Sequence, residues 1–87
     1  MIVGNVIGNV WATRKDENLN GLKLLVIKPL DYASDKDLPT FVAADSIGAG
    51  IGETVLVVNG SSARMALGRK DIPVDAIVVG IIDAVDV

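Results

Sequence analysis

Histidine and cysteine are both absent from the 87-residue chain. Their absence excludes serine–histidine triads, cysteine nucleophiles, disulfides and zinc sites with thiolate or imidazole ligands. Only carboxylates, lysines and hydroxyl groups remain for chemistry, so an enzyme built from this chain would be poorly equipped. The lack of cysteine is compatible with a reducing cytosol, and residues 1–5 lack the basic start of a secretory signal. We therefore expect a soluble cytosolic protein.

Long apolar runs, aromatic residues and clustered positive charges are also scarce. The longest uncharged apolar run, residues 76–82, is too short to cross a bilayer. The aromatic residues are Trp11, Tyr32 and Phe41, the net charge is −3, and the eight basic residues are scattered. Because nucleic-acid binding depends on clustered cations and aromatic platforms, we expect neither a nucleic-acid nor a membrane partner.

Aliphatic residues are what the chain has in plenty. Hydrophobic residues make up 51% of it and the mean hydropathy is +0.50. A domain of this size buries a smaller share of its surface than a large one does, so its core alone is a marginal source of stability. Surplus apolar surface buried between subunits would add to that stability. Composition thus predicts an obligate homo-oligomer of a single domain, residues 1–87, with no linker.

Alternating apolar residues predict a first strand at residues 2–13 with apolar groups on both faces, and therefore covered on both sides. Gly4 and Gly8 share one face with Val6 and leave room for a bend or a close backbone. Trp11 falls on the other face and is expected to pack in the core or at an interface. A charged hairpin loop, residues 14–21, ends in an Asn-Gly turn.

Four further strands and one short helix complete the predicted fold. Pro29 ends the second strand because it cannot donate to a central ladder. Ser61 or Ser62 is expected to cap a helix at 63–67 that stops at Gly68. The strands are expected at 22–27, 40–44, 54–58 and 76–82. Five strands with one helix indicate an all-β barrel, whose closure removes exposed sheet edges.

The segment after the third strand carries three glycines within five positions, Gly48, Gly50 and Gly52. A dinucleotide-binding loop needs G-x-G-x-x-G followed by a helix, whereas this segment reads G-x-G-x-G and leads into a β-branched strand. Glu53 would also repel a phosphate, and no Walker lysine follows. The pattern favours a structural turn, or a loop that meets another subunit.

Three blocks of the sequence resemble the EutN/CcmL family of bacterial microcompartment vertex proteins. They are GNVIGNVWATRK…LNGLKLLVIKPLD (residues 4–31), VAADSIGAGIGETVLVVNGSSAR (residues 42–64) and PVDAIVVGIID (residues 73–83). Each block alone is weakly specific, but together they cover nearly the whole chain in the family's order. Lys28 and Ile77 depart from residues common in the family, which would affect local packing or facet contacts.

The resemblance implies a five-stranded barrel similar to the oligonucleotide-binding fold, assembled as a homopentamer in the cytoplasm. Such pentamers cap the vertices of a polyhedral shell whose facets are tiled by hexameric shell proteins. The implied role is structural, without enzyme activity, cofactor or metal. The helix falls between the fourth and fifth predicted strands, unlike the usual oligonucleotide-binding order, which weakens any transfer of nucleic-acid binding.

Within such a ring we expect the glycine loop at a subunit interface or at the ring axis, because glycine has no Cβ to block close contact. The loop residues are Gly48, Ala49, Gly50, Ile51, Gly52 and Glu53. The candidate interface charges are Arg14, Lys15, Asp45 and Arg64, since arginine binds a carboxylate through two hydrogen bonds. The alternative for each charge is a solvated surface group. For Asp75 and Asp83 we expect hydrogen bonds at turns or strand ends.

Two other functions remain open at this point. A single-strand nucleic-acid-binding barrel is supported by fold class alone. A small carboxylate enzyme would use Asp45 and Glu53 as an acid and base pair if one of them were buried.

Overall fold

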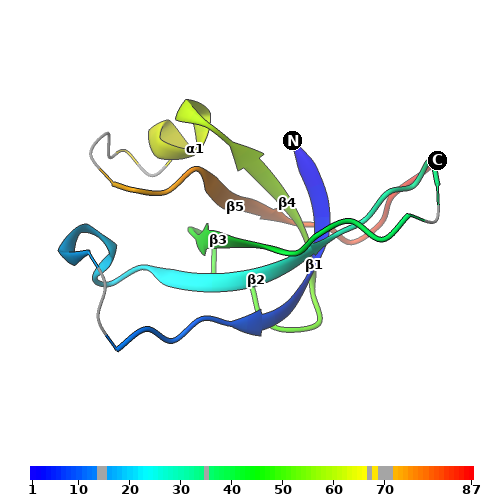
Figure 1. Cartoon of the computed structure of the whole chain (residues 1–87). Helices are drawn as coiled ribbons and strands as arrows, with labels where there is room; N and C mark the ends of the chain where they lie inside the picture. The colour runs from blue at the N-terminus through cyan, green and yellow to red at the C-terminus, as the bar shows by residue number, and fades with distance from the viewer. Residues whose placement is uncertain (14–15, 35, 67, 69–71) are drawn as a thin grey trace.

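The computed structural model describes residues 1–13, 16–34, 36–66, 68 and 72–87. The elements in chain order are β1 (Ile2–Asn9), the 3-10 helix η1 (Glu17–Leu19), β2 (Lys23–Pro29), β3 (Phe41–Asp45), β4 (Thr54–Asn59), α1 (Ser61–Ala66) and β5 (Ala76–Ile81). The strands close into a barrel in the order β1-β2-β3-β5-β4 (Figure 1). The predicted all-β, five-stranded barrel with one short helix is confirmed.

Neighbouring strands are antiparallel except at β3 and β5, which run parallel where Ala44 lies opposite Ile77. The helix α1 lies between β4 and β5 in the chain, as predicted. It begins at Ser61, two residues before the predicted start, so the expectation that Ser61 or Ser62 precedes the helix as its cap is wrong. Gly68 has the predicted left-handed backbone, with φ 69°.

The first strand is shorter than predicted and contains an irregularity. It ends at Asn9 rather than at residue 13, and its register with β2 shifts between Val6 and Gly8. Val6 lies opposite the buried Ile27, whereas Gly8 lies opposite the outward-facing Val26. Side chains alternate between the two faces of a strand, so one added residue moves every later side chain to the opposite face. The predicted faces therefore hold only as far as Val6.

Gly4 allows the close backbone contact that the sequence predicted. A Cβ on Gly4 would lie 2.5 Å from Cγ2 of Ile27 and 2.9 Å from the carbonyl oxygen of Lys28. A Cβ on Gly8 would have ordinary contacts of 3.8 Å and more with Val26. Of the two glycines, Gly4 is the one whose missing side chain lets β1 and β2 pack together.

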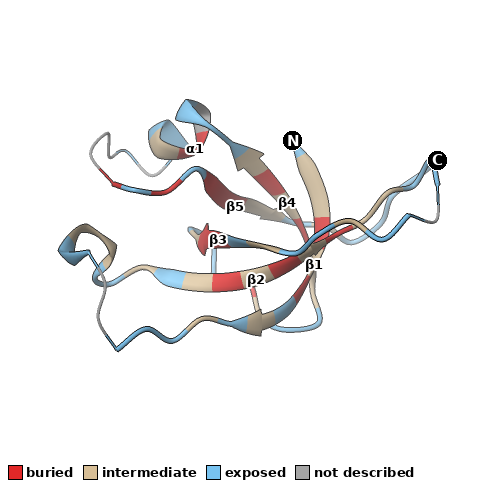
Figure 2. Cartoon of the chain, in the orientation of Figure 1, coloured by how far each residue is buried: buried red, intermediate tan, exposed pale blue. Residues whose placement is uncertain are grey.

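Buried residues concentrate in the strands (Figure 2). They form two groups, one inside the barrel and one outside its wall. The first fills the barrel and contains Val6, Leu25, Ile27, Ala43, Ala49, Val55, Val57, Ala76 and Val78. The second lies outside the wall and contains Ala44, Ala63, Ile72, Val74 and Ile77. Strand β5 contributes to both, which explains its continuous apolar sequence.

The outer face of β1 is not covered by the chain itself. Ile7 is 50% exposed and Trp11 is 90% exposed. The prediction that both faces of the first strand are covered is therefore wrong for a single chain, because α1 and its neighbours cover a different part of the barrel. Among the described residues, no helix has the length and apolarity needed to cross a membrane.

Candidate subunit interface

The glycine loop, residues 48–53, lies between β3 and β4 and is held by backbone hydrogen bonds. Gly48 and Gly52 have φ values of 84° and 93°, in the left-handed region that side chains disfavour. The N–H of Gly52 donates to the carbonyl oxygen of Val6 at 2.9 Å, and the N–H of Val6 donates to the carbonyl oxygen of Glu53 at 2.9 Å. These bonds fasten the loop to β1. The predicted structural turn is thus present.

The side chain of Glu53 is used inside the same loop. Its Oε1 accepts a hydrogen bond from the N–H of Gly50 at 2.7 Å, and its own N–H donates to the carbonyl oxygen of Gly50 at 3.2 Å. Gly50 has no positive φ, and a Cβ on it would lie 3.4 Å from that Oε1. Glu53 therefore stabilises the turn that contains Gly50.

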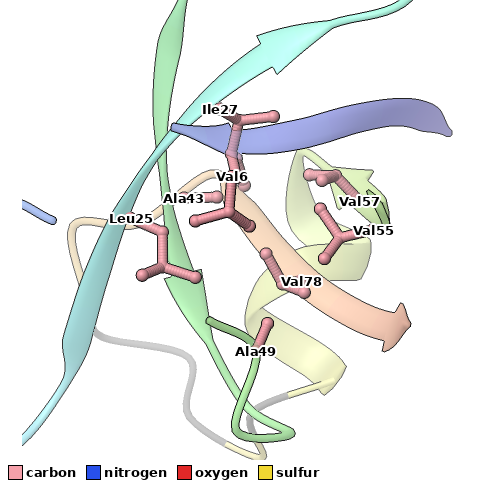
Figure 3. Close-up of a cluster of buried hydrophobic side chains, with 9 residues drawn as sticks. Val6, Leu25, Ile27, Ala43, Ala49, Val55, Val57 and Val78 are labelled. Carbon is pink, nitrogen blue, oxygen red and sulfur yellow. The ribbon is translucent and has the colours of Figure 1, made fainter. Parts of the chain in front are cut away.

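Ala49 points into the barrel rather than toward solvent. Figure 3 shows its side chain near Val78 at one end of the core cluster, and it is fully buried. Its carbonyl oxygen accepts a hydrogen bond from Nζ of Lys23 at 2.7 Å. The loop thus closes one end of the barrel, and the apolar side chain that it presents most openly is Ile51, which is 62% exposed.

Of the four candidate interface charges, the structure describes two, Asp45 and Arg64. Arg14 and Lys15 lie outside the described residues. The carboxylate of Asp45 accepts a hydrogen bond from the N–H of Ile47 at 3.1 Å, and Nη1 of Arg64 donates to the carbonyl oxygen of Val74 at 3.4 Å. Asp45 and Arg64 are therefore anchored to their own chain while remaining partly exposed.

Neither Asp45 nor Glu53 is buried, so the condition under which the two would act as an acid and base pair is not met. Each carboxylate accepts a backbone N–H within its own turn, the environment of a structural side chain. The described part of the chain contains no cluster of three acidic residues that would hold a metal ion.

An apolar groove at the other end of the barrel escaped the sequence analysis. We call it the end groove; its volume is about 450 Å³. It is lined by Met1, Ile2, Val3, Pro29, Leu30, Asp31, Tyr32, Leu38, Pro39 and Phe41. The sequence predicted no element over residues 31–39, and Tyr32 with the flanking Pro29 and Pro39 was the signal of an ordered surface there.

The one acidic group of the end groove, Asp31, is fixed by its own turn. Its carboxylate accepts hydrogen bonds from Oγ of Ser34 at 2.7 Å and from the N–H of Ala33 at 2.9 Å. These bonds, that from Ser34 first, lower the pKa of Asp31 below its usual value. The negative charge is thus held at the edge of an otherwise apolar groove.

Comparison with known proteins identifies the family of this chain. The model of the family described as "Ethanolamine utilisation protein EutN/carboxysome" matches residues 1–83. The chain belongs to the EutN/CcmL family. It is 48% identical to the microcompartment shell vertex protein GrpN of Rhodospirillum rubrum, over 99% of this chain and 97% of GrpN. It is 47% identical to the carboxysome shell vertex protein CcmL of Synechocystis sp., over 100% of this chain and 87% of CcmL.

Solved structures of the EutN/CcmL family have the same fold. CcmL of Gloeobacter violaceus superposes with a TM-score of 0.89 at 44% identity, covering 100% of this chain and 90% of that one. The pentameric shell protein GrpN superposes with a TM-score of 0.86 at 46% identity, covering 100% of both chains. The family consists of structural shell proteins rather than enzymes, and the nucleic-acid alternative gains no support from these relatives.

Proposed function

We propose that this chain forms a homopentamer that caps the vertices of a polyhedral bacterial microcompartment in the cytoplasm. The observation that carries the proposal is the similarity to GrpN, a pentameric shell protein that covers 100% of this chain at 46% identity. The relatives CcmL and EutN are likewise named as shell vertex proteins. A vertex of five subunits supplies curvature, because a lattice of hexagons alone stays flat or rolls into a tube.

The shape and surface of the chain suit assembly through side chains. The barrel is closed, so association by adding strands at a free sheet edge is not available. Large hydrophobic side chains remain in water in one chain, among them Trp11, Ile51 and Tyr32. Exposed apolar surface of this kind is typical of an interaction site. This exposed apolar surface is the surplus from which we predicted an oligomer on composition alone.

We infer that the glycine loop lies where subunits meet, at their interface or around the ring axis. Ala49 and the left-handed Gly48 and Gly52 fix the loop to the barrel, and Ile51 is its projecting apolar side chain. The partly exposed Arg64 and Asp45 are proposed as interface charges, together with Arg14 and Lys15. Hexameric facet proteins of the same shell are the proposed outer partners.

Native mass spectrometry of the full chain tests the pentamer. We expect a main species with five times the mass of one chain. A monomer at every concentration, or a ring of six, would contradict the proposal. Co-expression with hexameric facet proteins then tests the vertex role, because closed shells are expected with this chain and open sheets or tubes without it.

Gly50→Val tests the position of the glycine loop. The added isopropyl group faces a contact of 3.4 Å with Glu53 inside the chain and adds bulk where subunits are proposed to meet. We expect loss of the five-subunit mass with a folded barrel by circular dichroism. Gly8→Val, on β1, is the control, because Gly8 has no positive φ and a Cβ on it would have only ordinary contacts of 3.8 Å and more with Val26. An intact ring of Gly50→Val rejects the interface role of the loop.

A further inference from the structure

Trp11 is the most exposed large aromatic side chain in the described structure. It is the single tryptophan of the chain, it follows the end of β1, and it is 90% exposed. It belongs to the arm that continues the β1–β2 hairpin beyond the barrel (Figure 1), in which the N–H of Val10 still donates to the carbonyl oxygen of Leu24. An arm that presents an indole to water is suited to contact a partner, since tryptophan is enriched among the residues that contribute most to binding.

The end groove lies at the opposite end of the same strands. It is formed where β1 begins and β2 ends, whereas Trp11 lies beyond the point where β1 ends and β2 begins. Its volume of about 450 Å³ and its lining of aliphatic, proline and aromatic residues suit an aromatic side chain. Each chain therefore has an exposed indole at one end and a mostly apolar hollow at the other. A second hollow, of about 510 Å³, lies at the Trp11 end and is lined by Trp11 together with other residues of 9–13 and 21–24.

The exposed indole points to a protein partner. The chain exposes 5558 Å², whereas a compact monomer of this mass is expected to expose about 4,900 Å². This excess is a property of the whole chain and locates no patch by itself. Trp11, which is 90% exposed, locates one, because tryptophan is enriched at protein interfaces relative to the rest of a protein surface.

Ring symmetry identifies the partner as a second copy. A closed ring uses a heterologous contact, in which one patch of a subunit meets a different patch of the next subunit. We propose that Trp11 of each subunit packs into the end groove of its neighbour around the ring. This contact rests on the proposed pentamer and specifies its interface. The sequence predicted that Trp11 packs in the core or at an interface. Because Trp11 is 90% exposed, the interface is the alternative that is left.

Tryptophan fluorescence tests the contact, since emission of this chain comes from Trp11 alone. We expect blue-shifted emission and weak acrylamide quenching from the assembled ring, and red-shifted emission after dissociation by dilution. Native mass spectrometry of the same samples reports the assembly. A five-subunit mass with the emission of water-exposed indole overturns the contact and leaves the pentamer standing. A mass other than five subunits overturns the pentamer itself.

Substitution on each side of the contact gives a second test. Trp11→Ser and Tyr32→Ser are each expected to raise the dissociation constant of the ring at least about tenfold, with Trp11→Phe intermediate. Met65→Ser is the matched control, because Met65 is 74% exposed on α1, away from both patches. Circular dichroism checks that the variants fold. Assembly of Trp11→Ser equal to that of Met65→Ser overturns the contact.

Cross-linking shows which surfaces meet and does not depend on weakening the ring. The chain has no cysteine, so Ala12→Cys with Leu38→Cys places one thiol beside Trp11 and one in the end groove. A short bismaleimide is expected to give a ladder of up to five chains on a denaturing gel, and neither single variant gives one. Products that stop at two chains, or no products from an intact ring, overturn the proposed contact.

Discussion

Two parts of the barrel differ in whether the outer face of their strands is buried. On β3, β5 and β4, the outward-facing Ala44 and Ile77 lie beneath Ala63 of α1 and form a second core. On β1, β2 and β3, the outward-facing Ile7 and Val42 remain 50% and 47% exposed. We call these the covered wall and the bare wall. Both have aliphatic residues facing outward, so the difference depends on what the rest of the chain places over them.

The comparison separates residues that hold the fold from residues available to a neighbour. Side chains of the covered wall are expected to control the free energy of unfolding of the subunit. Exposed side chains of the bare wall and of the two ends of the barrel are expected to affect folding little, whereas glycines with a close backbone contact or a left-handed backbone are expected to affect it through the backbone. The following substitutions test this division, in order of decreasing effect.

Ile77→Ala is expected to lower the free energy of unfolding by about 2–5 kcal/mol, because a fully buried side chain leaves a cavity beneath α1. Ile77→Val, which removes one methylene group, is the control and is expected to cost about 0.5–1.5 kcal/mol. Urea denaturation at fixed protein concentration measures both. A cost below that of the valine control would mean that the covered wall is not a true second core.

Gly4→Ala is expected to lower the free energy of unfolding by about 1–3 kcal/mol, because its Cβ would press on the carbonyl oxygen of Lys28 and on Ile27. The matched control is Gly8→Ala on the same strand, whose Cβ has ordinary contacts with Val26. Thermal denaturation of the two variants compares them directly. Equal stabilities would show that β1 and β2 do not need the close approach at Gly4.

Much of the fold could be predicted from the sequence because the strands have a period of two and the turns contain glycine. The strands predicted at 54–58 and 76–82 agree with β4 and β5 to within about two residues, and Gly68 has the expected left-handed backbone. The register shift in β1 could not be predicted, because it exists only in the pairing with β2. The covered wall likewise depends on where α1 packs.

Part of the candidate interface could be predicted because glycines also mark its turn. Glycine spacing indicated a tight turn at residues 48–52, and the structure has one. The sequence did not indicate that Ala49 enters the core, because a small residue between two glycines looks like any other loop residue. The end groove was missed because its lining comes from separate segments of the chain, residues 1–3, 29–32 and 38–41.

Gly52→Ala is expected to lower the free energy of unfolding by about 1–2 kcal/mol through backbone strain, since its φ is 93° and its Cβ would meet no atom within 4 Å. Gly50→Ala is the control, since Gly50 has no positive φ. Chemical denaturation distinguishes them. If Gly50→Ala lowered the free energy of unfolding of dissociated subunits more than Gly52→Ala did, the contact with Glu53, rather than the backbone of Gly52, would control the loop conformation.

Val42→Ser is expected to have the smallest effect on folding, within about 0.5 kcal/mol, because the side chain already lies half in water. Ile7→Ser, on β1 of the same wall, is the companion variant and is expected to behave alike. Denaturation should be measured at a low and a high protein concentration, because burial by a neighbour stabilises the folded subunit only when the ring is assembled. A cost that rises above about 1 kcal/mol at the higher concentration would mean that a neighbouring subunit covers the bare wall. The two walls would then differ only in whether the same chain or the next one covers them.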